Sequence, residues 1–365
     1  MRETRRTRTS ATSLFAHPAT SLIRILITSR PEPHIFSVFS EEKNHAKAVL
    51  HDVEASVIEH DILVYLRAEL AEIPKKLNIP MPSSWAPDDD VVPLAQKAGK
   101  LFVYAATSLR FIGDESVCHP RMQLDVILSF QEAPEAAPFA DLDELYLQLL
   151  RTLPKSNPKF VIDRFQAVVG GIILLRDPLP LSALARFVKY DDYNVSTVLS
   201  QLHSVIVPPS RNNDVPRIYH PSFPDFLTDP SRCSDPRFNI AIPTHERRHT
   251  LRCFELMSKF LKRDLANIRD PSLINTKVEE FDQKVQDAVP SEVRYACLYW
   301  TAHLSCVVHG DEAVMWALKD FEKRLMLWWF EAMSLLGSIP VAAGLIQEAR
   351  RWAVCPLIPY WDLFF

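Results

Sequence analysis

The chain has 365 residues, of which 47% are hydrophobic and 24% charged, and this composition excludes a long disordered chain. Its 41 Lys and Arg against 45 Asp and Glu give a net charge of −4. That balance argues against a general nucleic-acid binder, which needs a basic surface to displace counterions. Six cysteines without a CxxC pair are typical of reduced thiols, and the apolar runs are too short to cross a bilayer. We therefore expect a cytoplasmic protein with neither nucleic-acid nor membrane partners.

The N-terminal region begins with a basic stretch. Residues 1–20 contain four arginines among several Ser and Thr, a composition shared with mitochondrial presequences, but they show no amphipathic period. We predict a disordered basic leader. Residues 23–28 (IRILIT) come next as a short β-branched run that ends before Pro31 and Pro33. Such a continuous apolar run predicts a strand buried on both faces, as in a parallel sheet.

Helical spacing of apolar residues dominates the rest of the chain. It predicts helices over residues 60–73, 91–112, 121–130 and from 141 onward. Beyond a proline-marked boundary at 154–158, three short helical patterns cover residues 160–175, 181–188 and 195–202. Two extended pieces, residues 204–208 and 217–220, follow them and are joined by a polar loop. That order predicts a winged-helix module. The last part is again helical, over residues 245–268, from 290 and over 311–336.

Two residues are candidates for binding an anion. Arg30 lies just after the predicted strand, and ligands of parallel sheets gather outside the carboxyl ends of the strands. Its guanidinium can offer two donors to a phosphate, although a surface arginine in a turn has the same spacing. His220 lies at the end of the second extended piece. It either projects from the wing toward an anion or caps a turn, and spacing alone leaves both interpretations open.

A third pattern indicates a different chemistry. His245, Glu246 and His249 match HExxH, in which two histidines on one helix face bind zinc and the glutamate acts as a base. The two intervening residues are both arginines, which disfavours a bound dication, and no third histidine occurs at metzincin spacing. We therefore predict no metal site and keep the zinc hydrolase as an alternative. A DNA-binding winged helix is weaker still, since residues 191–202 hold no Lys or Arg.

Five segments in order resemble the fungal NACHT-domain proteins of the STAND class of P-loop ATPases. They are residues 25–35 (ILITSRPEPHI), 100–112 (KLFVYAATSLRFI), 142–146 (LDELY), 220–227 (HPSFPDFL) and 294–300 (RYACLYW). The resemblance implies that residues 23–28 are the sensor strand of an NTPase core and that Arg30 senses the terminal phosphate. It also implies that His220 contacts the β-phosphate of ADP. In that family, nucleotide exchange is coupled to oligomerisation in innate-immunity-like signalling.

The sequence departs from that family at the nucleotide site. It has no GxxxxGK[ST] loop to cradle phosphates, and its Gly99-Lys100 pair falls inside the predicted helix over 91–112. We therefore expect a mainly α chain that retains only a remnant of a parallel α/β NTPase core. The predicted domains are the leader (residues 1–20) and the distal part of the NACHT core with a helical subdomain (21–153). The winged helix (154–232) and an α-helical domain (240–365) follow.

These observations predict a non-catalytic or truncated NACHT-type signalling fragment that acts through protein contacts, self-oligomers included. We expect no enzymatic activity and no cofactor. ATP or ADP with Mg²⁺ would bind only if the missing NTPase half were supplied, and Arg30 and His220 would otherwise be vestigial. Besides the zinc hydrolase, the remaining alternative is a full ATPase switch, which would result if the gene model were truncated upstream.

Overall fold

The computed structural model describes residues 53–82, 85–129, 139–154, 158–209, 211, 214–270 and 273–354. Most of these residues are helical, which confirms the expectation of a mainly α chain. The chain divides into two compact units, residues 1–58 and 59–365, and the second holds every described helix and strand except the start of α3. The predicted leader, the strand over 23–28 and Arg30 lie outside the described residues. Among the described helices, none combines the length and apolarity needed to cross a bilayer.

The first group of helices has the predicted order, with one correction. Its members are α3 (Ala55–Leu77), α4 (Asp88–Ala98), α5 (Phe102–Ile112), α6 (Pro120–Leu128) and α7 (Ala140–Arg151). The single helix predicted over 91–112 is wrong, because Gly99 adopts φ +53° and ends α4. Lys100 therefore lies between two helices rather than inside one. Most of the apolar face predicted for this stretch is buried, with Leu94, Ala105 and Ile112 fully enclosed, but Phe102, predicted on the same face, is 45% exposed.

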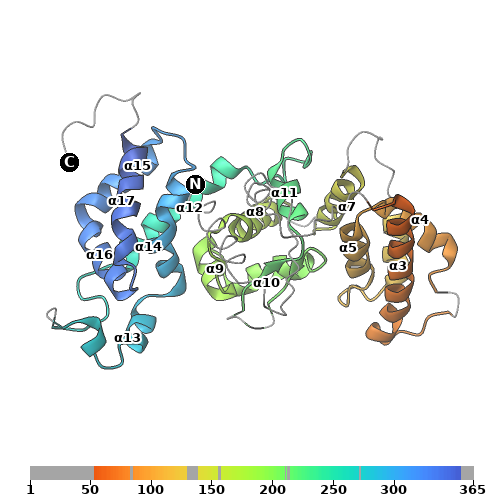
Figure 1. Ribbon diagram of the computed structural model, residues 1–365, viewed down its shortest axis with the longest axis horizontal. Coiled ribbons are helices and arrows are strands. Elements are labelled where there is room, and N and C mark those ends of the chain that lie inside the picture. Colours follow the sequence, from red (N-terminus) through yellow and green to blue (C-terminus); the bar gives the residue numbers. More distant parts are fainter. Residues whose placement is uncertain are drawn as a thin grey trace, which may run out of the picture. The chain divides into compact units, whose positions relative to one another are not determined.

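The second group comprises α8 (Pro158–Leu174), α9 (Leu181–Val188), α10 (Asp192–Gln201), β1 (Ile206–Val207), β2 (Arg217–Ile218) and α11 (Ser222–Thr228). Helices α8, α9 and α10 pack against one another (Figure 1), and β1 pairs with β2 in an antiparallel ladder. Two adjacent glycines bring α8 close to its neighbours. A Cβ on Gly171 would lie 3.0 Å from Val188 of α9, and one on Gly170 would lie 2.4 Å from His245.

The third group is entirely helical. It contains α12 (Ile242–Phe260), the short 3₁₀ helix η2 (Asn275–Lys277), α13 (Phe281–Ala288), α14 (Ser291–Leu304), α15 (Glu312–Asp320), the π-helical turn η3 (Phe321–Leu325), α16 (Met326–Leu335) and α17 (Ile339–Ala353). Helices α12 and α14 pack along each other (Figure 1). The predicted helix over 245–268 ends instead at Phe260. Beyond it, the Glu331 carboxylate accepts the backbone N–H groups of Asp264 and Leu265, which holds the chain in a loop.

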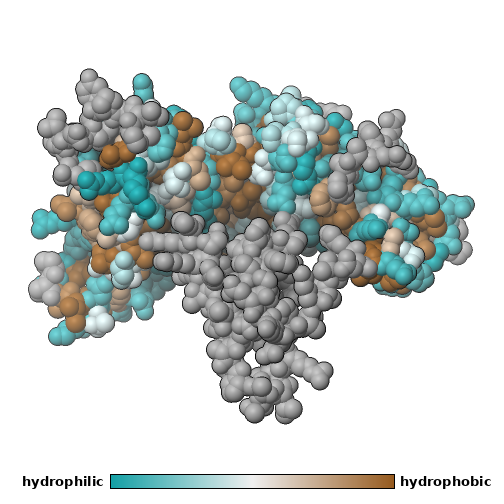
Figure 2. All heavy atoms as spheres, turned by 45° about the horizontal axis from the view of Figure 1, so that its top comes forward, coloured by the Kyte–Doolittle hydropathy of each residue, from teal (hydrophilic) through white to brown (hydrophobic). Residues whose placement is uncertain are grey.

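Aromatic side chains form the core of this third group. Trp300 packs 5.3 Å from Phe254 and 4.9 Å from Phe321 between ring centroids, and Trp329 completes the cluster. Not all aromatic residues there are enclosed, since Trp316 is 70% exposed. Apolar residues also reach the surface in separate patches among hydrophilic ones (Figure 2). The sequence between 316 and 330 therefore supplies both core and surface, as consecutive aromatic residues around a helix must.

Candidate functional site

His220 lies between β2 and α11 and is exposed. Its Nδ1 is 2.7 Å from Ser222 Oγ and accepts the Ser222 backbone N–H at 3.2 Å. Because a backbone N–H can only donate, Nδ1 is an acceptor, and the neutral ring carries its proton on Nε2. His220 thus caps the first turn of α11 through Nδ1, and its Nε2 is a hydrogen-bond donor.

The hydroxyl that meets His220 is itself anchored from another helix. Ser222 Oγ lies 2.8 Å from the Tyr146 hydroxyl of α7, and both residues are buried. The Tyr146 ring packs 5.1 Å from Phe223 and 5.5 Å from Phe226. Burial raises the pKa of Tyr146 to about 12, so the phenol keeps its proton at neutral pH. The chain Tyr146–Ser222–His220 therefore connects the interior of α7 to an exposed imidazole.

Two further contacts tie α7 and α5 to the region around His220. The Arg232 guanidinium donates to both Asp143 carboxylate oxygens, at 2.6 and 3.0 Å, and so joins the segment after α11 to α7. In α5, the Arg110 guanidinium lies 3.7 Å from the centroid of the Tyr219 ring, a close cation–π geometry. The structure thus brings together three of the five segments that carry the family resemblance, residues 100–112, 142–146 and 220–227.

The HExxH residues lie on α12, and their glutamate belongs to a closed hydrogen-bond ring. Arg176 donates to Glu246 Oε1 at 2.7 Å, and His303 Nδ1 lies 2.5 Å from Glu246 Oε2. His303 Nε2 lies 2.7 Å from the Tyr295 hydroxyl, whose oxygen accepts the Arg176 backbone N–H at 2.9 Å. Since a carboxylate only accepts, His303 carries its proton on Nδ1, and Nε2 accepts from Tyr295. The ring thus satisfies both carboxylate oxygens and both imidazole nitrogens.

Glu246, His249 and His303 lie close enough together to hold a metal ion. All three are buried, and each offers a donor atom within 4.8 Å of the others. However, both oxygens of Glu246 and both nitrogens of His303 already have hydrogen-bond partners, and the Arg176 cation adjoins the carboxylate. Of this donor set, only His249 presents a buried nitrogen, Nδ1, without a partner. The cluster fits a hydrogen-bond network better than a zinc site.

His245 takes no part in that cluster. Gln166 donates to two backbone carbonyls, so its Oε1 accepts from His245 Nε2 at 3.0 Å. The other ring nitrogen, Nδ1, faces Gly170, where even a methyl group would collide. Burial, and after it the nearby Arg248 charge, lowers the pKa of His245 to about 4. The HExxH spacing therefore does not assemble a two-histidine metal site, and the zinc-hydrolase alternative is not favoured.

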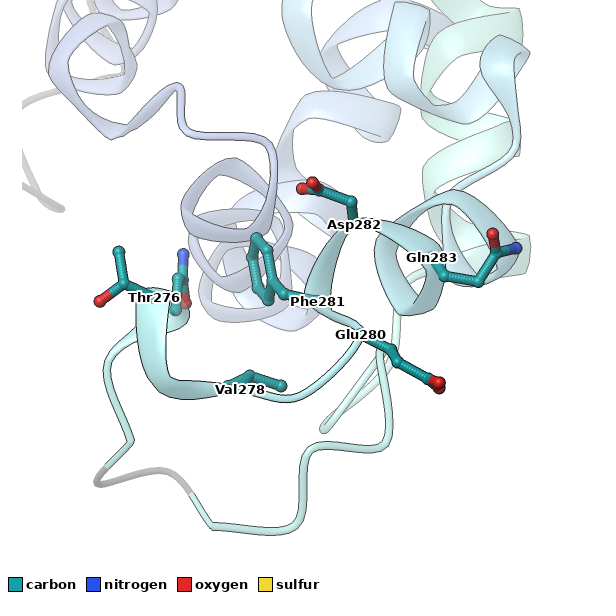
Figure 3. Close-up of a pocket in the computed structure, with 7 residues that line it drawn as sticks. Thr276, Val278, Glu280, Phe281, Asp282 and Gln283 are labelled. Atoms are coloured by element: carbon teal, nitrogen blue, oxygen red, sulfur yellow. The ribbon is translucent and has the colours of Figure 1, made fainter.

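A surface hollow lies beside η2 and the start of α13, lined by Asn275, Thr276, Val278, Glu280, Phe281, Asp282 and Gln283. Figure 3 shows the Glu280, Asp282 and Gln283 side chains pointing in different directions rather than toward a common centre. Specific small-molecule sites instead place a few polar groups so that they converge. This hollow therefore adds no candidate residues.

Sequence reasoning found His220 but not its partners. Tyr146 and Ser222 are separated by 76 residues, and no spacing rule links them. The same holds for Arg176 and Glu246, which are 70 residues apart. The one available signal was that residues 142–146 and 220–227 both carry the family resemblance. Arg30 falls outside the described residues, so the structure does not place it relative to His220.

The chain is similar to a known fungal protein. It is 26% identical over 234 residues to the vegetative incompatibility protein HET-E-1 of Podospora anserina. The match covers 57% of this chain and 16% of that protein. No family model matches the chain, and no solved structure matches it. The similarity to HET-E-1 supports a relationship between this chain and the fungal NACHT-type proteins.

Proposed function

We propose that this chain is a NACHT/STAND-type signalling protein that acts through protein contacts and does not itself hydrolyse ATP. The observation that carries the proposal is the similarity to HET-E-1. Support also comes from the geometry, since three of the segments that carry the family resemblance meet around His220. The chain spans 16% of HET-E-1, so the activity of that whole protein enters here only as part of the proposal.

The proposed domains are those that the sequence predicts. Residues 21–153 would be the distal, remnant part of an α/β NTPase core with its helical subdomain, and residues 240–365 an α-helical domain. Residues 154–232 would be a winged helix. That assignment is supported by three packed helices, α8 to α10, which precede the antiparallel β1–β2 ladder. As a winged helix it would bind protein rather than DNA, because residues 191–202 include no cation.

The nucleotide chemistry of this polypeptide is incomplete. Phosphoryl transfer in P-loop enzymes needs a glycine-rich loop, its lysine and Mg²⁺ ligands. The 365 residues contain no GxxxxGK[ST] sequence. ATP or ADP with Mg²⁺ would then be bound only in a complex that supplies these groups. In such a complex, His220 would donate from Nε2 to a phosphate oxygen and Arg30 would supply a second contact.

The proposed partners are proteins, including further copies of the chain, in a cytoplasmic signalling pathway of the innate-immunity type. Exposed apolar side chains on the third group of helices are compatible with such contacts. Trp316, Leu327 and Val308 are each at least 70% exposed. Large exposed apolar groups that gather in patches commonly mark interaction surfaces.

Phosphate release from Mg-ATP by the purified chain tests the central claim. We expect release at the background rate of the buffer, and the same rate for His220→Ala. Micromolar binding of Mg-ATP with turnover, lost in His220→Ala, would refute the non-catalytic proposal. The variant is a suitable control because His220 is exposed and its substitution does not open the core.

A further inference from the structure

A phosphate contact through His220 requires a proton on the correct nitrogen. An imidazole that offers Nε2–H to a phosphate must keep Nδ1 unprotonated when the ring is neutral. An isolated neutral histidine populates both tautomers, because the two ring nitrogens can exchange the proton through solvent. The surroundings of Nδ1 therefore decide whether His220 can act as a donor at Nε2.

Ser222 supplies two donors to Nδ1 in this structure. Its backbone N–H lies 3.2 Å from the nitrogen and its hydroxyl lies 2.7 Å away. The Ser222 hydroxyl has a single proton, so when it donates to His220 its oxygen can only accept from the Tyr146 phenol at 2.8 Å. The phenol remains protonated at neutral pH, since burial raises its pKa to about 12.

Tyr146 is fixed in place by packing on a different element. Its ring lies against Phe223 and Phe226 of α11, and Tyr146 is 1% exposed. One turn earlier in α7, Asp143 is paired with Arg232. The hydroxyl that orients Ser222 therefore depends on the docking of α7 against α11.

We propose that Ser222 and Tyr146 are positioning residues that hold the proton of His220 on Nε2, so that docking of α7 determines whether this histidine can donate to a phosphate. The inference rests on the proposed function for the role of the phosphate contact, whereas the tautomer can be measured without any nucleotide. It adds to that function a means by which α7 regulates the site.

The test is nitrogen-15 NMR of the full chain labelled at histidine, at a pH where His220 is neutral. His220 is assigned as the signal lost in His220→Ala. In the wild type we expect one unprotonated nitrogen, Nδ1, and one protonated nitrogen, Nε2. In Ser222→Ala the two shifts should move toward each other as the tautomers mix. Ser222→Thr, which restores the hydroxyl, should recover most of the separation.

Tyr146→Phe should move the shifts in the same direction but less than Ser222→Ala, because the Ser222 hydroxyl remains beside Nδ1. Tyr104→Phe is the matched control, since it removes the hydroxyl of another buried tyrosine, in α5. A wild-type ring protonated on Nδ1, or shifts unmoved by both Ser222→Ala and Tyr146→Phe, would overturn the inference. Millimolar ADP provides a separate arm. Because the 365 residues hold no phosphate loop, we expect ADP to leave the His220 shifts unchanged; a specific change at Nε2 would overturn the proposed lack of nucleotide binding, while the positioning role stands.

Discussion

The buried hydrogen-bond ring around Glu246 leads us to predict that loss of Arg176 and loss of Glu246, the two members of an ion pair, destabilise the chain to different extents. In Arg176→Met, the Glu246 carboxylate would remain buried, with only 2% of its side chain exposed and one hydrogen bond left, from His303. In Glu246→Gln, by contrast, the charge left alone belongs to Arg176, whose side chain is 32% exposed and can be hydrated. We therefore expect Arg176→Met to be the more destabilising change, although Arg176 is the more exposed residue.

The magnitude can be worked from the geometry. Two unit charges separated by 2.7 Å attract by about 6 kcal/mol at an effective dielectric constant of about 20, before desolvation is subtracted. Removing one partner of a buried pair costs about 3–5 kcal/mol, because the other charge is left uncompensated. We expect a loss in this range for Arg176→Met at neutral pH and a smaller loss for Glu246→Gln. The double variant should be more stable than Arg176→Met alone, because it removes the orphaned carboxylate.

Urea denaturation monitored by tryptophan fluorescence measures these losses, since Trp300 and Trp329 are fully buried near α12. Arg67→Met is the matched control. It breaks a pair with Asp88 at 2.9 Å, but both partners are largely exposed, so its loss should stay below about 1 kcal/mol. If Arg176→Met cost no more than Arg67→Met, or if the double variant were no more stable than Arg176→Met, the buried ring would not have the energetic role assigned to it.

Two further predictions concern the histidines of this region. Burial lowers the pKa values of His245 (to about 4), His249 and His303, so these rings are neutral in the folded chain and gain protons more readily when it unfolds. The free energy of unfolding should therefore fall as the pH drops below 6.5, and His245 alone should account for a loss of about 2 kcal/mol between pH 7 and pH 5. Urea midpoints that stay constant over this pH range would contradict the assignment of these histidines as buried and neutral. Gly170→Ala should cost roughly 1–3 kcal/mol in the same assay, because its methyl group would lie 2.4 Å from His245 Nδ1. Gly99→Ala meets no atom within 4 Å, so a loss of stability in that variant would report the strain of its positive φ without a clash.

Periodicity was sufficient to predict the principal helices but not their exact ends. Apolar spacing placed Ile62, Leu66 and Leu70 on the buried face of α3, and the structure buries all three. The apolar pattern runs through Gly99 without a gap, so it gives no sign that α4 ends at Ala98 and α5 begins at Phe102. The positive φ of Gly99 marks the break between the two helices, and hydrophobic spacing carries no information about a backbone angle.

The candidate site was less accessible to prediction, because its geometry depends on tertiary contacts. His220 could be named from its sequence segment, yet the sequence alone could not decide whether it caps a turn or faces an anion. The structure shows that Nδ1 caps the first turn of α11, and the contact of Nε2 with an anion stays a prediction. The residues that fix this arrangement, Ser222 and Tyr146, come together only when α7 docks on α11.

The HExxH pattern illustrates a more general ambiguity. Residues at positions i and i+4 share one face of a helix, and that face is as well suited to meeting a core as to binding a metal. In α12 it meets α8 and α14, and it places His245 against Gly170 and Glu246 against Arg176 and His303. Whether such a face binds a metal or packs into a core depends on the charge and hydrogen-bonding capacity of residues that lie far away in the sequence. A guanidinium beside the glutamate stabilises the carboxylate without a metal, so the identity of residue 176, rather than the spacing within the motif, determines which chemistry the helix can support.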